Sequence, residues 1–238
     1  MREKNPNQIT RVDGKNTFLE VMRDAFTIQK VHINFIEYDP NKNNQQTKKI
    51  ETYIDFDKFL FLIESILKGG LVAKAKAENA LLQERINKAL QEKQDTKYIY
   101  AKEVFVDMGG ISSKSLPRKI EAWKKKHPDK PMFNFEIPQG KCISRQFKIT
   151  PGMKKPWVLS GEQGIGDDNN KTGLIVPVPT GNDKMYRPKE IVRVPFESHD
   201  DLKKFALICK AHIEGFISAT YVDYVNKYNE YQKSRNQL

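Results

Sequence analysis

The stretch EIVRVPFESHDDLKKFALICKAHIEG, residues Glu190–Gly215, decides the fold. Its first part, Ile191–Phe196, alternates between two faces, which is typical of a half-buried β-strand. Ser198 can then cap a helix, with Asp201 as the acidic partner of a capping box. The helix carries one apolar stripe at the spacing of a buried face, formed by Leu202, Phe205, Ala206, Cys209, Ile213, Phe216 and Ile217. The stretch therefore predicts a strand, a tight turn and a capped helix.

A similar pattern occurs about 140 residues earlier, in IETYIDFDKFLFLIESILKG, residues Ile50–Gly69. An alternating strand ends at Ile54, and either Asp55 or Asp57 can cap the helix that follows. The apolar stripe of this helix is Phe59, Leu62, Ile63, Ile66 and Leu67. We therefore predict an α+β fold with two strand-rich units. Each unit is closed by a C-terminal helix, as in a ββββα-like repeat, and a long helix joins the two.

The segments between these stretches predict the boundaries of the units. Residues 1–16 are polar and aperiodic, which indicates a flexible arm. Residues 17–70 form the first unit, and 71–97 form a connecting helix rich in Ala, Leu, Glu and Lys. The second unit, with a basic insertion, covers 98–222. Residues 223–238 lose their apolar content and are predicted to form a polar tail.

Four segments carry more local predictions. Thr17–Phe26 is ambiguous, because Phe18, Val21, Met22 and Ala25 suit a short helix while the side chains at 18, 20 and 22 alternate poorly as a strand. Tyr98–Met108 predicts a strand that the following glycine pair ends, and Met132–Ile137 predicts another strand. Gly161–Gly173, GEQGIGDDNNKTG, predicts a glycine-rich hairpin tip. It is not a Walker A phosphate loop, because two aspartates follow Gly166 where that motif needs Lys and Ser or Thr.

Positive charge is concentrated in one part of the chain. The formal net charge is +11, and residues 114–155 contain 12 Lys and Arg against 3 Asp and Glu, a net +9. A surface that is merely solvated usually mixes charges of both signs, whereas a concentration of one sign repels itself and suits a polyanionic partner. Nucleic acid is the favoured partner. Plain solubility and an acidic protein partner are the alternatives.

The sequence lacks features that membrane proteins, metal-binding proteins and enzymes with two-metal chemistry require. No apolar run of membrane-spanning length and no signal peptide occurs, so we expect a soluble, cytoplasmic protein that does not bind membranes. The four histidines lie singly, without metal-ligand spacing, so we expect no metal and no cofactor. No acidic pair suited to two-metal chemistry stands out, so we expect no enzyme activity. Cys209 lies in an apolar stripe and is predicted to be buried.

Cations and aromatic rings occur together on the predicted outer faces of the strands. Binding of an unpaired nucleic-acid strand requires this combination, because cations follow the phosphates and each stacked base contributes about 1–3 kcal/mol. The candidate nucleic-acid-binding residues are Lys148, Lys154, Lys155, Trp157, Tyr186, Arg187, Lys189 and Arg193 in the second unit, with Lys30, His32, Lys48, Lys49 and Tyr53 in the first. For Trp157 and Tyr186, a position in the core is the alternative.

Short strands, a hairpin, a final strand of the form I-x-V-x-F or I-x-x-I-D-F and one capped helix, all occurring twice, resemble a known fold. It is the single-stranded-DNA-binding fold of Whirly proteins and positive-cofactor-four transcriptional coactivators. Gln146–Phe216 fits best, and Ile50–Leu67 is the second copy. The resemblance implies curved four-stranded sheets with helices behind them, and nucleic acid across exposed strand edges and faces. It offers no counterpart for Leu71–Lys93 or Ser113–Lys130.

Three functions follow from these observations. The leading hypothesis is a sequence-tolerant single-stranded-DNA-binding protein that acts in replication, recombination or the transfer of a mobile element. It would act as a homo-oligomer or in a nucleoprotein complex, and RNA is the alternative ligand. The second hypothesis is a structural or regulatory assembly factor that uses the helix Leu71–Lys93 and the tyrosine-bearing C-terminal helix to join a larger complex. The third is an enzyme that acts on nucleic acid.

Overall fold

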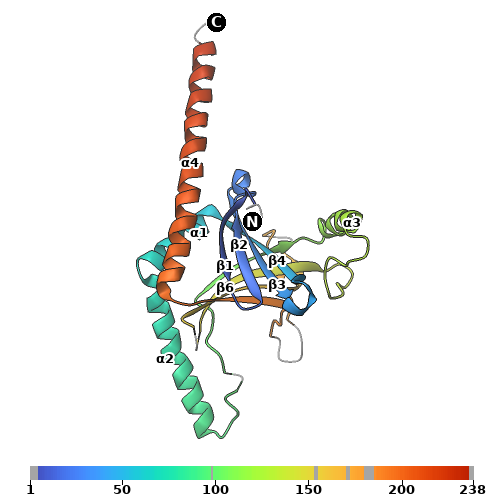
Figure 1. Cartoon of the computed structure of the whole chain (residues 1–238), viewed down its shortest axis with the longest axis vertical. Coiled ribbons are helices and arrows are strands. Elements are labelled where there is room, and N and C mark those ends of the chain that lie inside the picture. Colours follow the sequence, from blue (N-terminus) through green and yellow to red (C-terminus); the bar gives the residue numbers. More distant parts are fainter. Residues whose placement is uncertain (1–4, 98, 153–154, 170–171, 180–184, 236–238) are drawn as a thin grey trace.

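The part of the chain that the structure describes forms two antiparallel sheets and four α-helices, an α+β architecture (Figure 1). The computed structural model describes residues 5–97, 99–152, 155–169, 172–179 and 185–235. Sheet A has the order β1 (Gln8–Asp13), β2 (Thr17–Met22), β3 (Lys30–Asp39), β4 (Gln45–Asp55). Sheet B has the order β5 (Phe105–Ile111), β6 (Cys142–Pro151), β7 (Trp157–Asp168), β8 (Ile175–Pro177), and β9 (Glu190–Phe196) also pairs with β7. The helices are α1 (Phe56–Leu67), α2 (Gly70–Gln91), α3 (Leu116–Lys126) and α4 (His199–Arg235).

Sheet A is an antiparallel meander that leads directly into α1. The inward-facing side chains of β3 include Ile33 and Phe35, both fully buried, as alternation along a half-buried strand requires. Asp55 is the N-cap residue of α1, but its side chain does not cap the helix. The carboxylate instead accepts a hydrogen bond from Lys30 Nζ at 2.6 Å. The helix start is therefore as predicted, and of the two capping alternatives the side chain of Asp55 forms no capping hydrogen bond.

Sheet B leads into α4 through the predicted cap. Ser198 Oγ accepts a hydrogen bond from the backbone N–H of Asp201 at 3.0 Å, and the same hydroxyl donates to the Asp201 carboxylate at 2.7 Å. The hydrogen bond from Ser198 holds the pKa of Asp201 below its usual value. This strand, cap and helix confirm the prediction made for Glu190–Gly215.

One apolar core joins the two sheets and their helices. Phe35 of sheet A meets Phe147 of sheet B with ring centroids 5.9 Å apart. From α1, Ile63 is 1% exposed, and from α4, Phe205 is 4% exposed. The two helices also pack against each other, and Lys210 of α4 donates to Glu64 of α1 at 2.5 Å. Both sheets therefore share one hydrophobic interior, in which Cys209 is fully buried, as predicted.

Two helices extend away from this core in opposite directions (Figure 1). The helix predicted for residues 71–97 is observed as α2, and it buries only one narrow stripe. On α4, Ile213 is the last buried residue among those whose side chains the structure describes. The helix nevertheless continues to Arg235, so the prediction of a polar tail over 223–238 is corrected to a helix over its described part. The loss of apolar residues misled because an exposed helix needs no buried stripe.

Near the N-terminus, the structure corrects one prediction and resolves one ambiguous segment. Residues 1–16 are not only an arm, because β1 lies within them and pairs with β2, with Ile9 buried at 6% exposure. The ambiguous segment Thr17–Phe26 forms a strand over Thr17–Met22. The side chains that face the core are those of Leu19 and Val21, both fully buried. The side chains at 18, 20 and 22 lie on the other face, where no apolar pattern is required.

In the second unit, two predicted strands are corrected. Met132–Ile137 forms no strand in the described structure. Its Phe133 instead packs in a small core that includes Leu116, the first residue of α3. The strand predicted at Tyr98–Met108 begins at Phe105 and continues through the glycine pair. At Gly110, φ is 153°, and a Cβ would lie 1.9 Å from the carbonyl oxygen of Ile143. The glycine therefore permits close approach of the strands instead of ending one.

The glycines predicted to form a hairpin tip at Gly161–Gly173 lie largely within strand β7. A Cβ on Gly161 would lie 2.5 Å from the ring of Phe35. The ring of Phe35, from sheet A, therefore occupies the space that a side chain at residue 161 would need. Sheet packing therefore explains this glycine better than turn formation does.

Candidate nucleic-acid interface

Most of the lysines proposed on the strands are neutralised by carboxylates. The pairs are Lys30 with Asp55 at 2.6 Å, Lys48 with Glu37 at 2.9 Å, Lys49 with Glu51 at 2.7 Å, Lys148 with Glu162 at 2.7 Å, and Lys155 with Glu197. A phosphate that approached such a lysine would have to compete with the carboxylate already bound. Binding to a phosphate backbone gains most from cations that have no protein partner. These five lysines are therefore weak candidates.

The aromatic residue expected to stack on a base, Trp157, lies in the core. It is 3% exposed, and its Nε1 donates to His199 Nδ1 at 3.1 Å. A base cannot reach a ring in this position without rearrangement of the core. The alternative weighed for Trp157, a core position, therefore fits the structure.

Substitution Trp157→Ala is expected to lower the free energy of unfolding by about 3–5 kcal/mol, because it removes a large buried ring. Chemical denaturation measures this change. Tyr100→Ala is the matched control, because Tyr100 is 64% exposed and its loss should change stability by no more than about 0.5 kcal/mol. Equal stability of the two variants would contradict the core position of Trp157.

Several of the other proposed residues lie over one face of sheet B. Lys148 and Arg193 share one face of sheet B, opposite the face that carries Arg145 and Phe147. Tyr186 is half-buried, and burial of its hydroxyl raises its pKa to about 12. Arg187, Lys189 and Arg193 are exposed, and Lys154 lies outside the described residues.

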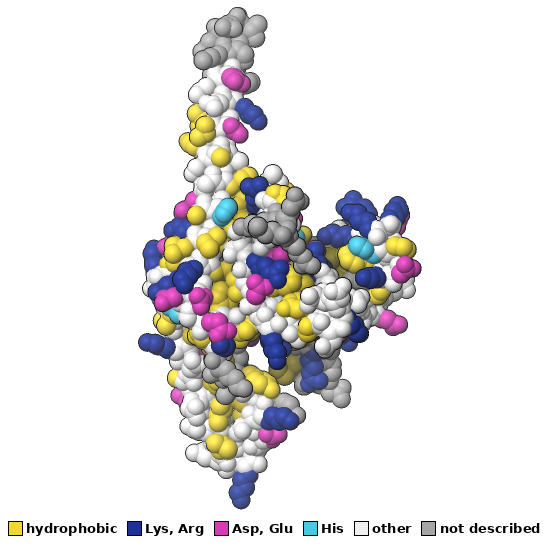
Figure 2. All heavy atoms as spheres, in the orientation of Figure 1, with side chains coloured by type: hydrophobic (Ala, Val, Ile, Leu, Met, Phe, Trp, Pro, Cys, Tyr) yellow, Lys and Arg dark blue, Asp and Glu magenta, His cyan; other side chains and the backbone are white. Residues whose placement is uncertain are grey.

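A group of exposed cations without ion pairs lies on α3 and its flanks. Figure 2 shows Lys and Arg side chains crowded over this helix, which stands out from the body of the molecule. In the described part of the chain, six exposed cations of this region form no ion pair: Lys114, Arg118, Lys119, Lys124, Lys126 and Lys130. Lys125 pairs only with Glu121 of the same helix, at 2.9 Å on the surface. We call these six residues the α3 cations.

The base of α3 is fixed to the body by its own packing. Leu116 is buried in a small core with Ile111, Phe133 and Ile143. Trp123 packs on His127 with centroids 4.2 Å apart and donates Nε1–H to the carbonyl of Lys130 at 2.9 Å. The cations therefore project from an anchored helix. The candidate residues chosen from the sequence omitted them, although the net +9 of this segment was the signal for them.

A recess beside α3 contains Tyr53, and we call it the Tyr53 pocket. It has a volume of about 580 Å³, and its lining includes Lys30, Glu51, Tyr53, Asp107, Lys119 and Arg145. Tyr53 is 38% exposed, and its ring stacks on His32 at 4.5 Å with an interplanar angle of 12°. His32 is 5% exposed, and its Nδ1 lies 2.9 Å from Asp24. His32, proposed as a contact residue, is thus a buried support for Tyr53.

Arg145 reaches the pocket from β6 as part of a buried polar network. Its side chain is 7% exposed, its Nε donates to Gln163 Oε1 at 3.2 Å, and its Nη1 lies 3.5 Å from Glu51 Oε2. Gln163 in turn donates to Glu190 at 2.5 Å. Burial lowers the pKa of Arg145, and the neighbouring carboxylate of Glu51 opposes this shift. The network fixes the guanidinium at the junction of the two sheets.

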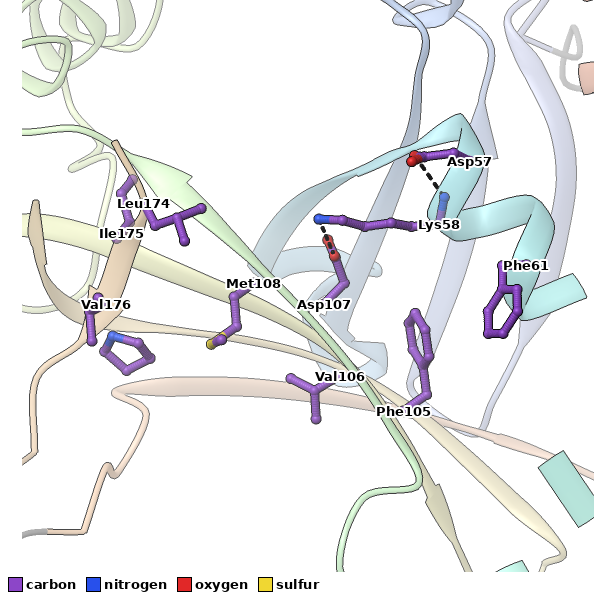
Figure 3. A pocket seen from close by; sticks show the side chains of 11 residues that line it. Asp57, Lys58, Phe61, Phe105, Val106, Asp107, Met108, Leu174, Ile175 and Val176 are labelled. Atoms are coloured by element: carbon purple, nitrogen blue, oxygen red, sulfur yellow. Dashed lines mark hydrogen bonds and ion pairs between the residues drawn. The ribbon is translucent and has the colours of Figure 1, made fainter. Parts of the chain in front are cut away.

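An apolar groove adjoins the Tyr53 pocket (Figure 3), and we call it the Phe61 groove. It has a volume of about 680 Å³ and shares five lining residues with the pocket: Lys58, Asp107, Met108, Leu174 and Ile175. Phe61 is 73% exposed at its rim, and Met108 is 55% exposed. In Figure 3, Lys58 extends from α1 towards Asp107, with Nζ and Oδ1 3.2 Å apart. The groove is thus a largely apolar surface beside a polar pocket.

No group of three or more His, Cys, Asp and Glu in the part of the chain that the structure describes could hold a metal ion. No helix in it has both the length and the apolar character needed to cross a membrane.

Comparison of the chain with protein-family models, with curated proteins and with solved structures found no match.

Proposed function

We propose that this chain is a sequence-tolerant single-stranded-DNA-binding protein in which the α3 cations follow the phosphate backbone. The observation that carries the proposal is the contrast between two sets of lysines. Lysines on the strands pair with carboxylates, whereas the α3 cations have no ion-pair partner among the described residues. Exposed like charges at close spacing repel one another, and release of their counterions or contact with a polyanion relieves this repulsion.

The order of the elements supports a two-unit fold like that of the Whirly proteins. Four antiparallel strands, β1 to β4, precede α1, and the paired strands β5, β6, β7 and β9 precede α4. We propose that these are two copies of a ββββα unit, joined by α2 and paired within one chain. On this proposal α3 is an insertion between the first two strands of the second copy. The protein would act in replication, recombination or transfer of a mobile element.

The experiment that tests the proposal compares three ligands by fluorescence anisotropy. Labelled single-stranded DNA, duplex DNA and single-stranded RNA of equal length are titrated with the full chain at one salt concentration. We expect the single-stranded DNA to bind most tightly, with little dependence on its sequence. Preference for duplex would contradict the proposal, and preference for RNA would replace DNA by RNA as the ligand.

A second candidate function, assembly of a larger complex, is favoured by the exposed apolar side chains of α4. Ile217, Tyr221, Tyr224 and Tyr228 recur at intervals of four, three and four residues, and each is at least 42% exposed. This spacing places them along one side of the helix, as in a coiled-coil seam. The Phe61 groove is a second apolar surface. A pull-down of partner proteins that survives nuclease treatment would favour assembly over nucleic-acid binding.

A further inference from the structure

We propose that the Tyr53 pocket receives one unpaired nucleobase, which stacks on Tyr53 while its backbone lies against the α3 cations. This inference rests on the proposed function and names the part of the ligand that the pocket recognises. Three observations support it: the position of the Tyr53 ring, the mixed charges of the pocket lining, and the presence of Lys119 both in the lining and among the α3 cations.

The ring of Tyr53 is held in place with one face already occupied. His32 covers that face in a stacked geometry, and Asp24 fixes His32 through Nδ1. Tyr53 is nevertheless 38% exposed and lines the pocket. Burial of the phenol, together with the charge of Glu51, raises the pKa of Tyr53 to about 12, so its hydroxyl stays protonated. A pre-positioned, partly exposed ring loses little freedom when a base stacks on it.

The lining of the pocket suits the edge of a base better than a phosphate. Lys30, Lys58, Lys119 and Arg145 provide donors, while Glu51, Asp55 and Asp107 provide acceptors. A phosphate would be repelled by the carboxylates, whereas a base edge carries both donors and acceptors. Each carboxylate has about four lone-pair sites and each guanidinium has five donors, so the ion pairs already present leave hydrogen-bonding capacity. The α3 cations, by contrast, are chemically suited to phosphates.

Lys119 joins the two surfaces. It belongs to α3, it is exposed, and it also lines the Tyr53 pocket. A nucleotide whose base entered the pocket would therefore have its own phosphate, or the next one, beside this helix. The base and phosphate subsites are thus adjacent, as binding of one continuous strand requires.

The test compares oligo-dT with a backbone of the same length made only of abasic sites. Stacking of one base is worth about 1–3 kcal/mol, so wild-type protein should bind oligo-dT about 5- to 150-fold more tightly. Tyr53→Ala should remove most of this difference and leave the affinity for the abasic backbone unchanged. Tyr53→Phe keeps the ring and should recover most of the loss. Tyr100→Ala, at an exposed tyrosine outside the pocket, should behave as wild type.

The outcomes separate this inference from the proposed function. If the wild-type protein binds oligo-dT and the abasic backbone equally, or if Tyr53→Ala weakens both equally, the base pocket is wrong while backbone binding stands. If the wild-type protein binds neither, both the proposed function and the pocket are wrong. A melting curve for Tyr53→Ala checks that the variant is folded, and the comparison of the two ligands on wild-type protein needs no variant.

Discussion

Substitution Ile63→Asp or Phe205→Asp is expected to abolish folding. The two side chains are 1% and 4% exposed, and both lie in the core that α1 and α4 share with the sheets. Each variant would place an unpaired carboxylate in a dry interior, which costs more than a protein with about 5–15 kcal/mol of stability tolerates. Soluble expression and thermal melting followed by circular dichroism measure the effect.

The same helices provide matched controls at exposed positions. Phe61 on α1 is 73% exposed and Leu207 on α4 is 53% exposed, so Phe61→Asp and Leu207→Asp should fold and melt close to wild type. If Ile63→Asp were soluble with a native melting temperature, α1 would not be part of the core. The N-terminal sheet would then be dispensable for the stability of the rest.

Reversal of three α3 cations, Lys124→Glu, Lys126→Glu and Lys130→Glu, is expected to lower the affinity for single-stranded DNA about 100-fold or more at 0.1 M salt. Each lost phosphate contact on a single strand removes about 0.7 from the salt slope, so three contacts remove about 2. All three residues are exposed, so the variant should remain folded. Anisotropy titrations over a range of salt concentrations measure both the affinity and the slope.

The control is a variant with the same change of charge on another helix. Lys74→Glu, Lys76→Glu and Lys93→Glu alter exposed residues on α2 and at its C-terminal end, on a part of the molecule that points away from α3 (Figure 1). Its affinity should stay within a few fold of wild type. Equal losses in the two variants would mean that net charge, and not the α3 surface, attracts the nucleic acid.

Those elements that bury one face over a sufficient length could be predicted from the sequence. The strand and cap before α4 and the apolar stripe of α1 carry their own periodicity, and both are observed. The glycine-rich part of β7 was predicted to be a hairpin tip because its glycines serve contacts that are distant in the sequence, such as that of Gly161 with Phe35. The described part of residues 223–238 was predicted to be a polar tail because the described tyrosine side chains of α4 are exposed and no buried stripe marks the helix there.

The candidate site was predicted less well, for a related reason. Charge along the sequence shows where cations are but not which carboxylates they meet. Lys148 pairs with Glu162, and Lys49 with Glu51, through pairings that depend on strand register or side-chain direction. Arg145 joined the pocket only because β6 and β4 come together in the fold. The +9 segment was recognised from composition alone, and α3 within it now carries the proposed interface.

The most direct test of the central claim is the salt dependence of binding of a single-stranded oligonucleotide to the wild-type chain. If about five of the six α3 cations each meet a phosphate, the logarithm of the binding constant should fall linearly with the logarithm of salt concentration, with a slope of about −3.5. A slope near zero, or the same slope after reversal of Lys124, Lys126 and Lys130, would contradict the account.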